Sequence, residues 1–182
     1  MPGDLIVGGP NGAGKTTFAL EYLAGRPLPF LSADAIATEI NPEAPDQAKT
    51  EAGKAFFRRL GALIQGRGSF VAESTLAGLR FARVMERLQA EGYTVTLVFI
   101  FLVSPDVCVA RVQERVRKGG HHVPEADVRR RYHRSKRNFW DVYRLKADRW
   151  KLYHNTTEGF QGVATGKAMR MWSVMKRPFG GS

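Results

Sequence analysis

A glycine-rich segment near the start of the chain has the spacing of a phosphate-binding loop. Gly9, Gly14, Lys15 and Thr16 fit the pattern G-x-x-x-x-G-K-[ST]. Glycines in this pattern let successive backbone N–H groups turn inward around phosphate oxygens, and a helix that begins near Lys15 adds the positive end of its dipole. The lysine reaches the β- and γ-phosphates, and the Thr16 hydroxyl ligates Mg²⁺. We therefore expect a nucleoside triphosphate to bind to Gly9, Pro10, Asn11, Gly12, Ala13, Gly14, Lys15, Thr16 and Thr17.

Two further polar segments directly follow predicted strands. Asp34 comes after the apolar run 27–33, and Glu73 and Thr75 come after the run 69–72. Because ligands of parallel sheets bind at the carboxyl ends of strands, we expect these side chains beside the glycine loop. Asp34 is suited to accept the proton of an acceptor hydroxyl, with Mg²⁺ ligation and helix capping as alternatives. Glu73 would order Mg²⁺-bound water or bind a substrate hydroxyl, and Thr75 would donate to substrate or phosphate; an ordinary turn is the alternative.

The net charge of +11 comes largely from basic residues between positions 111 and 151. Three interpretations remain open: a surface that binds nucleic acid, a clamp for nucleotide and substrate phosphates, or a solvated face. Two predicted helices joined by the glycine-containing segment 119–124 resemble a lid whose arginines neutralise a transferring phosphoryl group. Aromatic residues at helical spacing favour a core-facing stripe over a base-stacking platform in this segment: Tyr132, Phe139, Trp140 and Tyr143.

Strands and helices alternate along most of the chain. Strands are expected at 4–7, 27–33, 69–72, 93–103 and 152–155, and helices at 35–40, 46–65, 79–90, 104–118 and 124–146. This predicts an α/β fold of the P-loop NTPase type: a three-layer sandwich with a mostly parallel five-stranded sheet and a helical Arg-rich lid. Residues 160–175 would form a hairpin with a turn at Gly166 and Lys167, or a helix over 167–175. We expect one domain over residues 1–182, with its core at about 4–157.

Composition favours a cytoplasmic protein without a membrane partner. No apolar run is long enough to cross a bilayer, and the N-terminus lacks the pattern of a secretory signal. Cys108, the single cysteine, lies among apolar residues, which favours a buried structural thiol over a nucleophile. Together with His121, His122 and His133 it forms no recognised zinc-binding spacing.

Several of these segments together resemble the zeta toxin family of P-loop kinases, particularly its shorter bacterial members. The matching segments are 9–18, 31–37, 72–78, 119–124 with 129–135, and 150–155, so the resemblance covers roughly residues 4–157. It implies an ATP- and Mg²⁺-dependent kinase. Well-known members of the family phosphorylate the 3′-hydroxyl of the sugar in UDP-N-acetylglucosamine.

The resemblance also implies roles for individual residues. Lys15 and Thr16 would bind nucleotide and metal, and Asp34 would be the base that activates the acceptor hydroxyl. Glu73 and Thr75 would contact the substrate. The lid arginines, Arg117 and Arg130, would stabilise the transferred phosphate. We thus expect γ-phosphoryl transfer from ATP to a small-molecule hydroxyl, such as that of a nucleotide sugar, and an antitoxin protein as a further partner. A nucleic-acid-binding P-loop ATPase and a nucleic-acid-end kinase are the alternatives.

Overall fold

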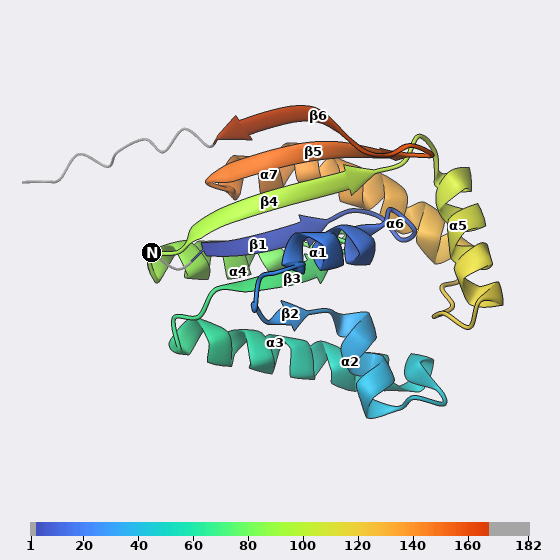
Figure 1. The fold of residues 1–182 in the computed structure, drawn as a ribbon, viewed down its shortest axis with the longest axis horizontal. Helices are drawn as coiled ribbons and strands as arrows, with labels where there is room; N and C mark the ends of the chain where they lie inside the picture. Colours follow the sequence, from blue (N-terminus) through green and yellow to red (C-terminus); the bar gives the residue numbers. More distant parts are fainter. Residues whose placement is uncertain (1–2, 168–182) are drawn as a thin grey trace, which may run out of the picture.

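The computed structural model describes residues 3–167 of the 182-residue chain. Six strands form one sheet in the order β2–β3–β1–β4–β5–β6 (Figure 1). The first five are parallel, and β6 runs antiparallel to β5. The strands are β1 Gly3–Gly8, β2 Phe30–Leu31, β3 Phe70–Ser74, β4 Thr94–Phe101, β5 Arg149–Thr156 and β6 Gly159–Lys167. The predicted three-layer α/β architecture is confirmed, with one strand more than expected.

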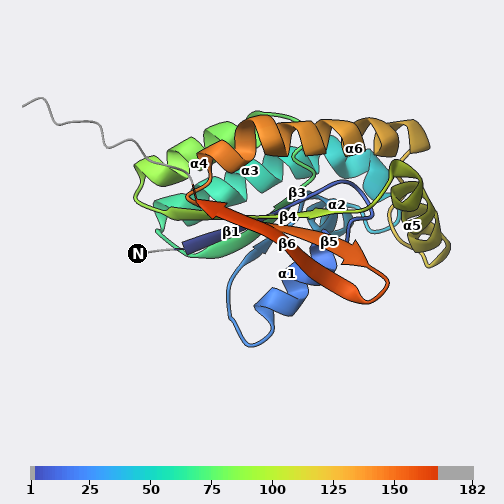
Figure 2. The same ribbon diagram turned by 90° about the horizontal axis from the view of Figure 1, so that it is seen from above.

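Helices cover both faces of this sheet. Figure 2 shows α3, α4 and α6 together on one face and α1 on the other, while α5 lies beyond the carboxyl ends of the strands. The elements are α1 Lys15–Leu23, α2 Ala33–Ile40, η1 Pro45–Ala48, α3 Lys49–Gln65, α4 Arg80–Ala90, α5 Pro105–Arg117, α6 Glu125–Asn138, η2 Phe139–Tyr143 and α7 Arg144–Lys146. No helix within residues 3–167 is long and apolar enough to cross a membrane.

Strand β1 separates two apolar layers. Ile6 belongs to the large cluster formed with α3, α4 and η2, whereas Leu5 and Val7 belong to the cluster that includes Ala19 of α1. Successive side chains of a strand point to opposite faces, so a strand covered by helices on both sides is apolar throughout. The sheet therefore holds the end of β1, where the glycine loop begins, rigidly between two packed layers.

The segment predicted as one helix over 124–146 is divided in the structure. Helix α6 passes into the π-helical turn η2 and then into the short α7. The predicted core-facing aromatic stripe is confirmed for Tyr132, Phe139 and Tyr143, which are buried, whereas Trp140 is 43% exposed. The wider π-helical turn η2 rotates the residues that follow it about the helix axis. At the start of this turn the ring of Phe139 stacks on the ring of Phe99, with the centroids 4.5 Å apart.

The C-terminal hairpin turns earlier than the sequence predicts. Thr156 pairs with Gly159, and the Thr156 hydroxyl accepts a hydrogen bond from the Glu158 backbone N–H at 3.1 Å. Gly166 and Lys167 lie inside β6, so the predicted turn at these two residues is wrong. A Cβ at Gly166 would lie 2.4 Å from the Trp150 ring, so this glycine marks a close approach between strands. The alternative helix over 167–175 falls outside the described residues beyond Lys167.

The single cysteine is part of the core. Cys108 is fully buried in the cluster between α5 and α6, and burial raises the pKa of its thiol to about 11. A thiol in this environment stays protonated at neutral pH. The prediction of a buried structural thiol is confirmed.

Candidate active site

The glycine loop connects the end of β1 to the start of α1. The Ala13 backbone N–H donates to the Pro10 carbonyl at 3.2 Å and closes a tight turn. Gly9 has a φ of 147°, and a Cβ there would lie 2.2 Å from the Ile100 carbonyl oxygen of β4. Only glycine fits this position. The loop leads directly into the N-terminus of α1, where the backbone N–H groups of the first turn are suited to bind an anion.

Two opposing effects act on the pKa of Lys15, the first residue of α1. Its Nζ donates to the Pro10 carbonyl at 3.1 Å, across the mouth of the loop. Burial lowers the pKa of Lys15, while the nearby carboxylates of Glu73 and Asp34 act in the opposite direction. A partly desolvated ammonium group next to two carboxylates interacts strongly with any phosphate that enters the loop.

Glu73 of β3 forms hydrogen bonds to residues at the starts of α1 and α2. Its Oε2 accepts a hydrogen bond from the Thr16 hydroxyl at 2.8 Å, and its Oε1 accepts one from the Ser32 hydroxyl at 2.7 Å. Glu73 is only 8% exposed, so both bonds lie in a region of weak solvent screening. The sequence prediction omits Ser32. In the sequence, Ser32 stands at a position typical of a helix N-cap. In the structure its hydroxyl accepts a hydrogen bond from the Ala35 backbone N–H at 3.3 Å, as an N-cap does.

Asp34 lies in the first turn of α2. Because Ser32 is the N-cap of that helix, the alternative that Asp34 serves as the cap is wrong. The Asp34 side chain instead lines a cavity that Lys15 and Glu73 also line. The Asp34 carboxylate is therefore available to a molecule that binds in this cavity.

The cavity has a volume of about 190 Å³ and lies where β1, β2 and β3 end, against α3 and α4. Polar side chains from several elements face it: Asn11, Lys15, Asp34, Glu73, Ser74, Thr75 and Arg131. Its apolar wall consists of Phe56 and Phe57 of α3 and Phe81 of α4. The structure therefore brings the predicted residues Lys15, Asp34, Glu73 and Thr75 to one place.

Helix α6 and η2 fix the loop that carries Thr75. The Ser135 hydroxyl donates to the Thr75 carbonyl, and the Asn138 amide donates to the Leu76 carbonyl at 2.9 Å. The Tyr143 hydroxyl donates to the carbonyl of Gly78. Ser135 and Tyr143 are fully buried, so these contacts hold the loop in one conformation. The predicted second helix of the lid is thus anchored to the strand ends.

The arginines of that helix differ in what they face. Arg131 lines the cavity, and its Nη1 donates to the Asn11 side-chain oxygen at 3.4 Å. Arg130 pairs with Asp127 at 2.9 Å, and Arg117 is exposed at the end of α5; neither lines the cavity. The sequence prediction missed Arg131, because adjacent helical residues point about 100° apart and spacing alone did not reveal which one faces inward.

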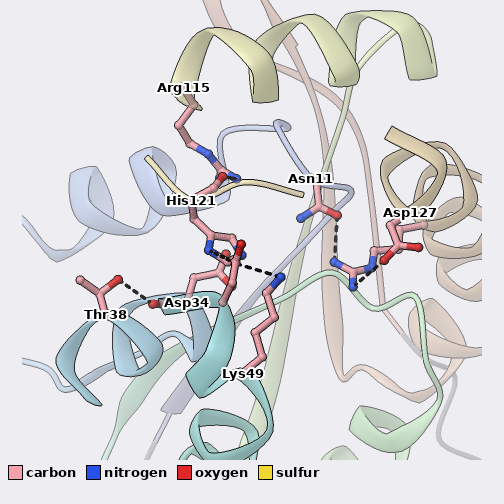
Figure 3. A network of polar contacts seen from close by, with 9 residues as sticks. Asn11, Asp34, Thr38, Lys49, Arg115, His121 and Asp127 are labelled. Carbon is pink, nitrogen blue, oxygen red and sulfur yellow. Dashed lines mark hydrogen bonds and ion pairs between the residues drawn. The ribbon is translucent and has the colours of Figure 1, made fainter. Parts of the chain in front are cut away.

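Figure 3 shows a second polar network, which includes Arg115, His121 and Lys49. The Arg115 guanidinium donates to the His121 carbonyl at 2.8 Å, and His121 Nδ1 lies 3.0 Å from Asp46 Oδ1. Asp46 also pairs with Lys49 at 3.0 Å. Burial lowers the pKa of His121, and the neighbouring carboxylates of Asp34 and Asp46 oppose this. The segment after α5 is thus tied to the α2–α3 connection beside Asp34.

Other basic residues of the 111–151 segment are paired with acids. Arg129 contacts Asp106 at 2.7 Å and Glu125 at 2.8 Å, and Lys118 contacts Glu114 at 2.8 Å. These pairs neutralise part of the positive charge of the segment.

The donor set beside the loop fits a magnesium ion held mainly by phosphates. Within residues 3–167 no cluster of three or more His, Cys, Asp or Glu side chains forms a metal site. The Thr16 hydroxyl, oriented by Glu73, supplies the single protein oxygen that an ion shared with nucleotide phosphates needs. The residues present therefore fit Mg²⁺ bound together with a nucleotide.

Solved structures share this fold at low sequence identity. A chain of the PezAT chromosomal toxin–antitoxin system of Streptococcus pneumoniae has a TM-score of 0.65 at 17% identity, covering 91% of this chain and 72% of that one. The AvrRxo1-ORF1–ORF2 complex with ATP gives 0.65 at 18%, covering 91% and 58%. Shikimate kinase from Bacteroides thetaiotaomicron gives 0.52 at 20%, covering 84% and 86%. The fold is that of the α/β P-loop kinases.

Sequence comparison gives the family. An uncharacterised protein of Haemophilus influenzae is 32% identical over 124 residues, which cover 68% of this chain and 88% of that protein. The model of the AAA domain family AAA_33 matches residues 5–137, a range that includes the glycine loop, Asp34, Glu73 and the α5–α6 pair. The chain belongs to the AAA domain family AAA_33.

Proposed function

We propose that this protein is a kinase that transfers the γ-phosphoryl group of ATP to a hydroxyl of a small molecule, with a nucleotide sugar such as UDP-N-acetylglucosamine as the acceptor. One observation carries the proposal: Lys15 belongs both to the glycine loop and to the cavity that Asp34 and Glu73 line. Donor and acceptor sites that share a cationic residue have the arrangement that phosphoryl transfer needs.

The donor half binds and neutralises phosphate. The loop N–H groups and the α1 N-terminus would hold the β- and γ-phosphates, and Lys15 would contact both. Thr16 would hold Mg²⁺, which when bound neutralises the charge that develops on the phosphate oxygens. Arg131 faces the same cavity and would add a second cation on the acceptor side.

The acceptor half orients a hydroxyl. Asp34 would accept the hydroxyl proton as the oxygen forms a bond to the γ-phosphorus, and ADP would leave with the electrons of the broken P–O bond. Thr75, whose carbonyl the buried Ser135 fixes, would position the acceptor through its own hydroxyl. Contacts of Arg117 and Arg130 with the transferred phosphate remain part of the proposal, although neither residue lines the cavity in this structure.

The test combines an acceptor panel with two variants. Labelled ATP is offered with nucleotide sugars, small alcohols and 5′-hydroxyl oligonucleotides. Asp34→Asn should retain ATP binding and lose transfer by about 10²–10⁴-fold, the usual contribution of a general base. Lys15→Ala should weaken both binding and transfer. Asp141→Asn, an exposed acid of η2 outside the cavity, serves as the control.

The results of this test distinguish the proposed kinase activity from its alternatives. Transfer to a nucleotide sugar that depends on Asp34 supports the proposal, and wild-type transfer by Asp34→Asn would show that another group is the base. Phosphorylation of oligonucleotide ends, or steeply salt-dependent binding to short DNA or RNA, would replace the proposal with one of the nucleic-acid alternatives. The similarity to the PezAT chain also supports an antitoxin protein as a partner.

A further inference from the structure

Helix α3 contains two glycines in its interior, Gly53 and Gly61. Glycine destabilises a helix interior relative to alanine, so each needs a reason. A Cβ built at either position meets no atom within 4 Å, so the packing of the protein excludes a side chain at neither. The two positions differ in one respect: Gly53 lines the cavity of the candidate active site, and Gly61 does not.

The side chains next to Gly53 form a firm apolar wall. Phe56 and Phe57 follow it by three and four residues on the same side of α3, with their rings in an edge-to-face contact at 5.2 Å. Phe81 packs 5.9 Å from Phe56, and both are buried. The guanidinium of Arg80 covers the Phe57 ring at 3.5 Å. Gly53 lines the same cavity without adding a side chain to this wall.

The volume limits what can fill this space. The cavity measures about 190 Å³. An engineered protein cavity of about 150 Å³ holds one benzene molecule, so this cavity has room for one six-membered ring with its substituents. Its wall of phenylalanine rings suits the C–H face of a ring, and the carboxylate of Asp34 on the polar side is suited to accept hydrogen bonds from ring hydroxyls.

We propose that the cavity holds the single hydroxyl-bearing ring of the acceptor, and that the absence of a side chain at Gly53 sets the largest ring it accepts. The inference rests on the proposed function and deepens it. In a nucleotide sugar the ring that receives the phosphoryl group would enter the cavity, and the nucleotide would remain outside. Gly53 is then a residue that determines specificity.

Four variants test this: Gly53→Ala and Gly53→Leu, with Gly61→Ala and Gly61→Leu as matched controls in the same helix. Dissociation constants are measured by calorimetry for three monocyclic probes, glucose, N-acetylglucosamine and shikimate, and for the acyclic probe glycerol. Thermal unfolding shows that each variant folds, and both alanine variants should raise the Tm because they remove a helix glycine. Gly53→Leu should weaken binding of the tightest ring at least about 10-fold relative to glycerol, with a smaller effect of Gly53→Ala.

The outcomes separate this inference from the proposed function. Unchanged ring binding in Gly53→Leu, equal losses in the two leucine variants, or no binding of any monocyclic probe to the wild type would overturn the inference. If ring binding depends on position 53 but the wild type phosphorylates neither the bound ring nor its nucleotide-linked form, the proposed function fails and the ring site stands. Transfer to the nucleotide sugar at the wild-type rate in Gly53→Leu would leave the function intact and overturn the ring site.

Discussion

Asp4 at the start of β1 makes the stability of this protein depend on pH. Its side chain is 3% exposed, and within residues 3–167 no other residue donates a hydrogen bond to either carboxylate oxygen. Burial raises the pKa of Asp4 from 3.8 to about 7, and the charge of Asp148 adds to the rise. The unfolded chain exposes the group to water, where its pKa returns to the ordinary value.

The size of the effect follows from that difference. A shift of about 3 pKa units corresponds to about 4 kcal/mol, taken as an upper limit because a folded protein relaxes around a buried charge. Because the pKa is raised in the folded state, the contribution to stability is complete below about pH 4. It is lost as the pH rises to about 7, and above that it stays level. Ionisation of Asp4 thus opposes folding at neutral and alkaline pH.

Asp4→Asn removes this ionisation and nearly preserves the shape of the side chain. We expect the free energy of unfolding of the variant, relative to wild type, to increase by up to about 3 kcal/mol between pH 4.5 and pH 8, because part of the full effect is already lost at pH 4.5. Urea denaturation at the two pH values measures it, with the exposed Asp141→Asn as the control. If the wild type and Asp4→Asn lose or gain stability in parallel between these pH values, the pKa of Asp4 is the same in the folded and the unfolded protein and the reasoning is refuted.

Three further changes test contacts around the site. Asn155→Ala removes the amide that donates to the Ala13 carbonyl at 2.9 Å, so ATP should bind about 5–10-fold more weakly while circular dichroism shows an intact fold. Cys108 should resist alkylation in the native protein and react in urea, because its thiol is buried; rapid native labelling would contradict this. Arg131→Gln should reduce kcat/KM at least about 10-fold and more than Arg130→Gln does, since of these two arginines only Arg131 lines the cavity in this structure; equal losses would argue against that difference.

The sequence was sufficient for the features that depend on local pattern. Gly9, Gly14, Lys15 and Thr16 identified the loop because close approach of backbone to phosphate leaves few choices of residue. The strand–helix alternation predicted the parallel sheet, and a parallel sheet places Asp34 and Glu73 at neighbouring strand ends. These predictions needed only the order of the elements, and exact boundaries were unimportant.

The remaining features depend on contacts between distant segments. Arg131 could not be distinguished from Arg130 without knowing which side of α6 faces the sheet. The strand β6 was expected only as part of a hairpin with its turn at Gly166 and Lys167, because a glycine at that position resembles a turn. The aromatic wall of the cavity combines α3 with α4, whose sequences each show only an amphipathic helix. Tertiary packing therefore decides which of several equivalent residues reaches the site.

Glu73 shows how the structure narrows a role that the sequence left open. A threonine hydroxyl has one proton to donate and two lone pairs. Because Thr16 donates its proton to Glu73, its lone pairs remain available to a magnesium ion, so the two contacts are compatible and reinforce each other. Both oxygens of Glu73 are already occupied, by Thr16 and by Ser32. The carboxylate is thus better suited to orient these two hydroxyls than to hold a metal ion directly, and Asp34 is left as the acid group free to accept the acceptor's proton.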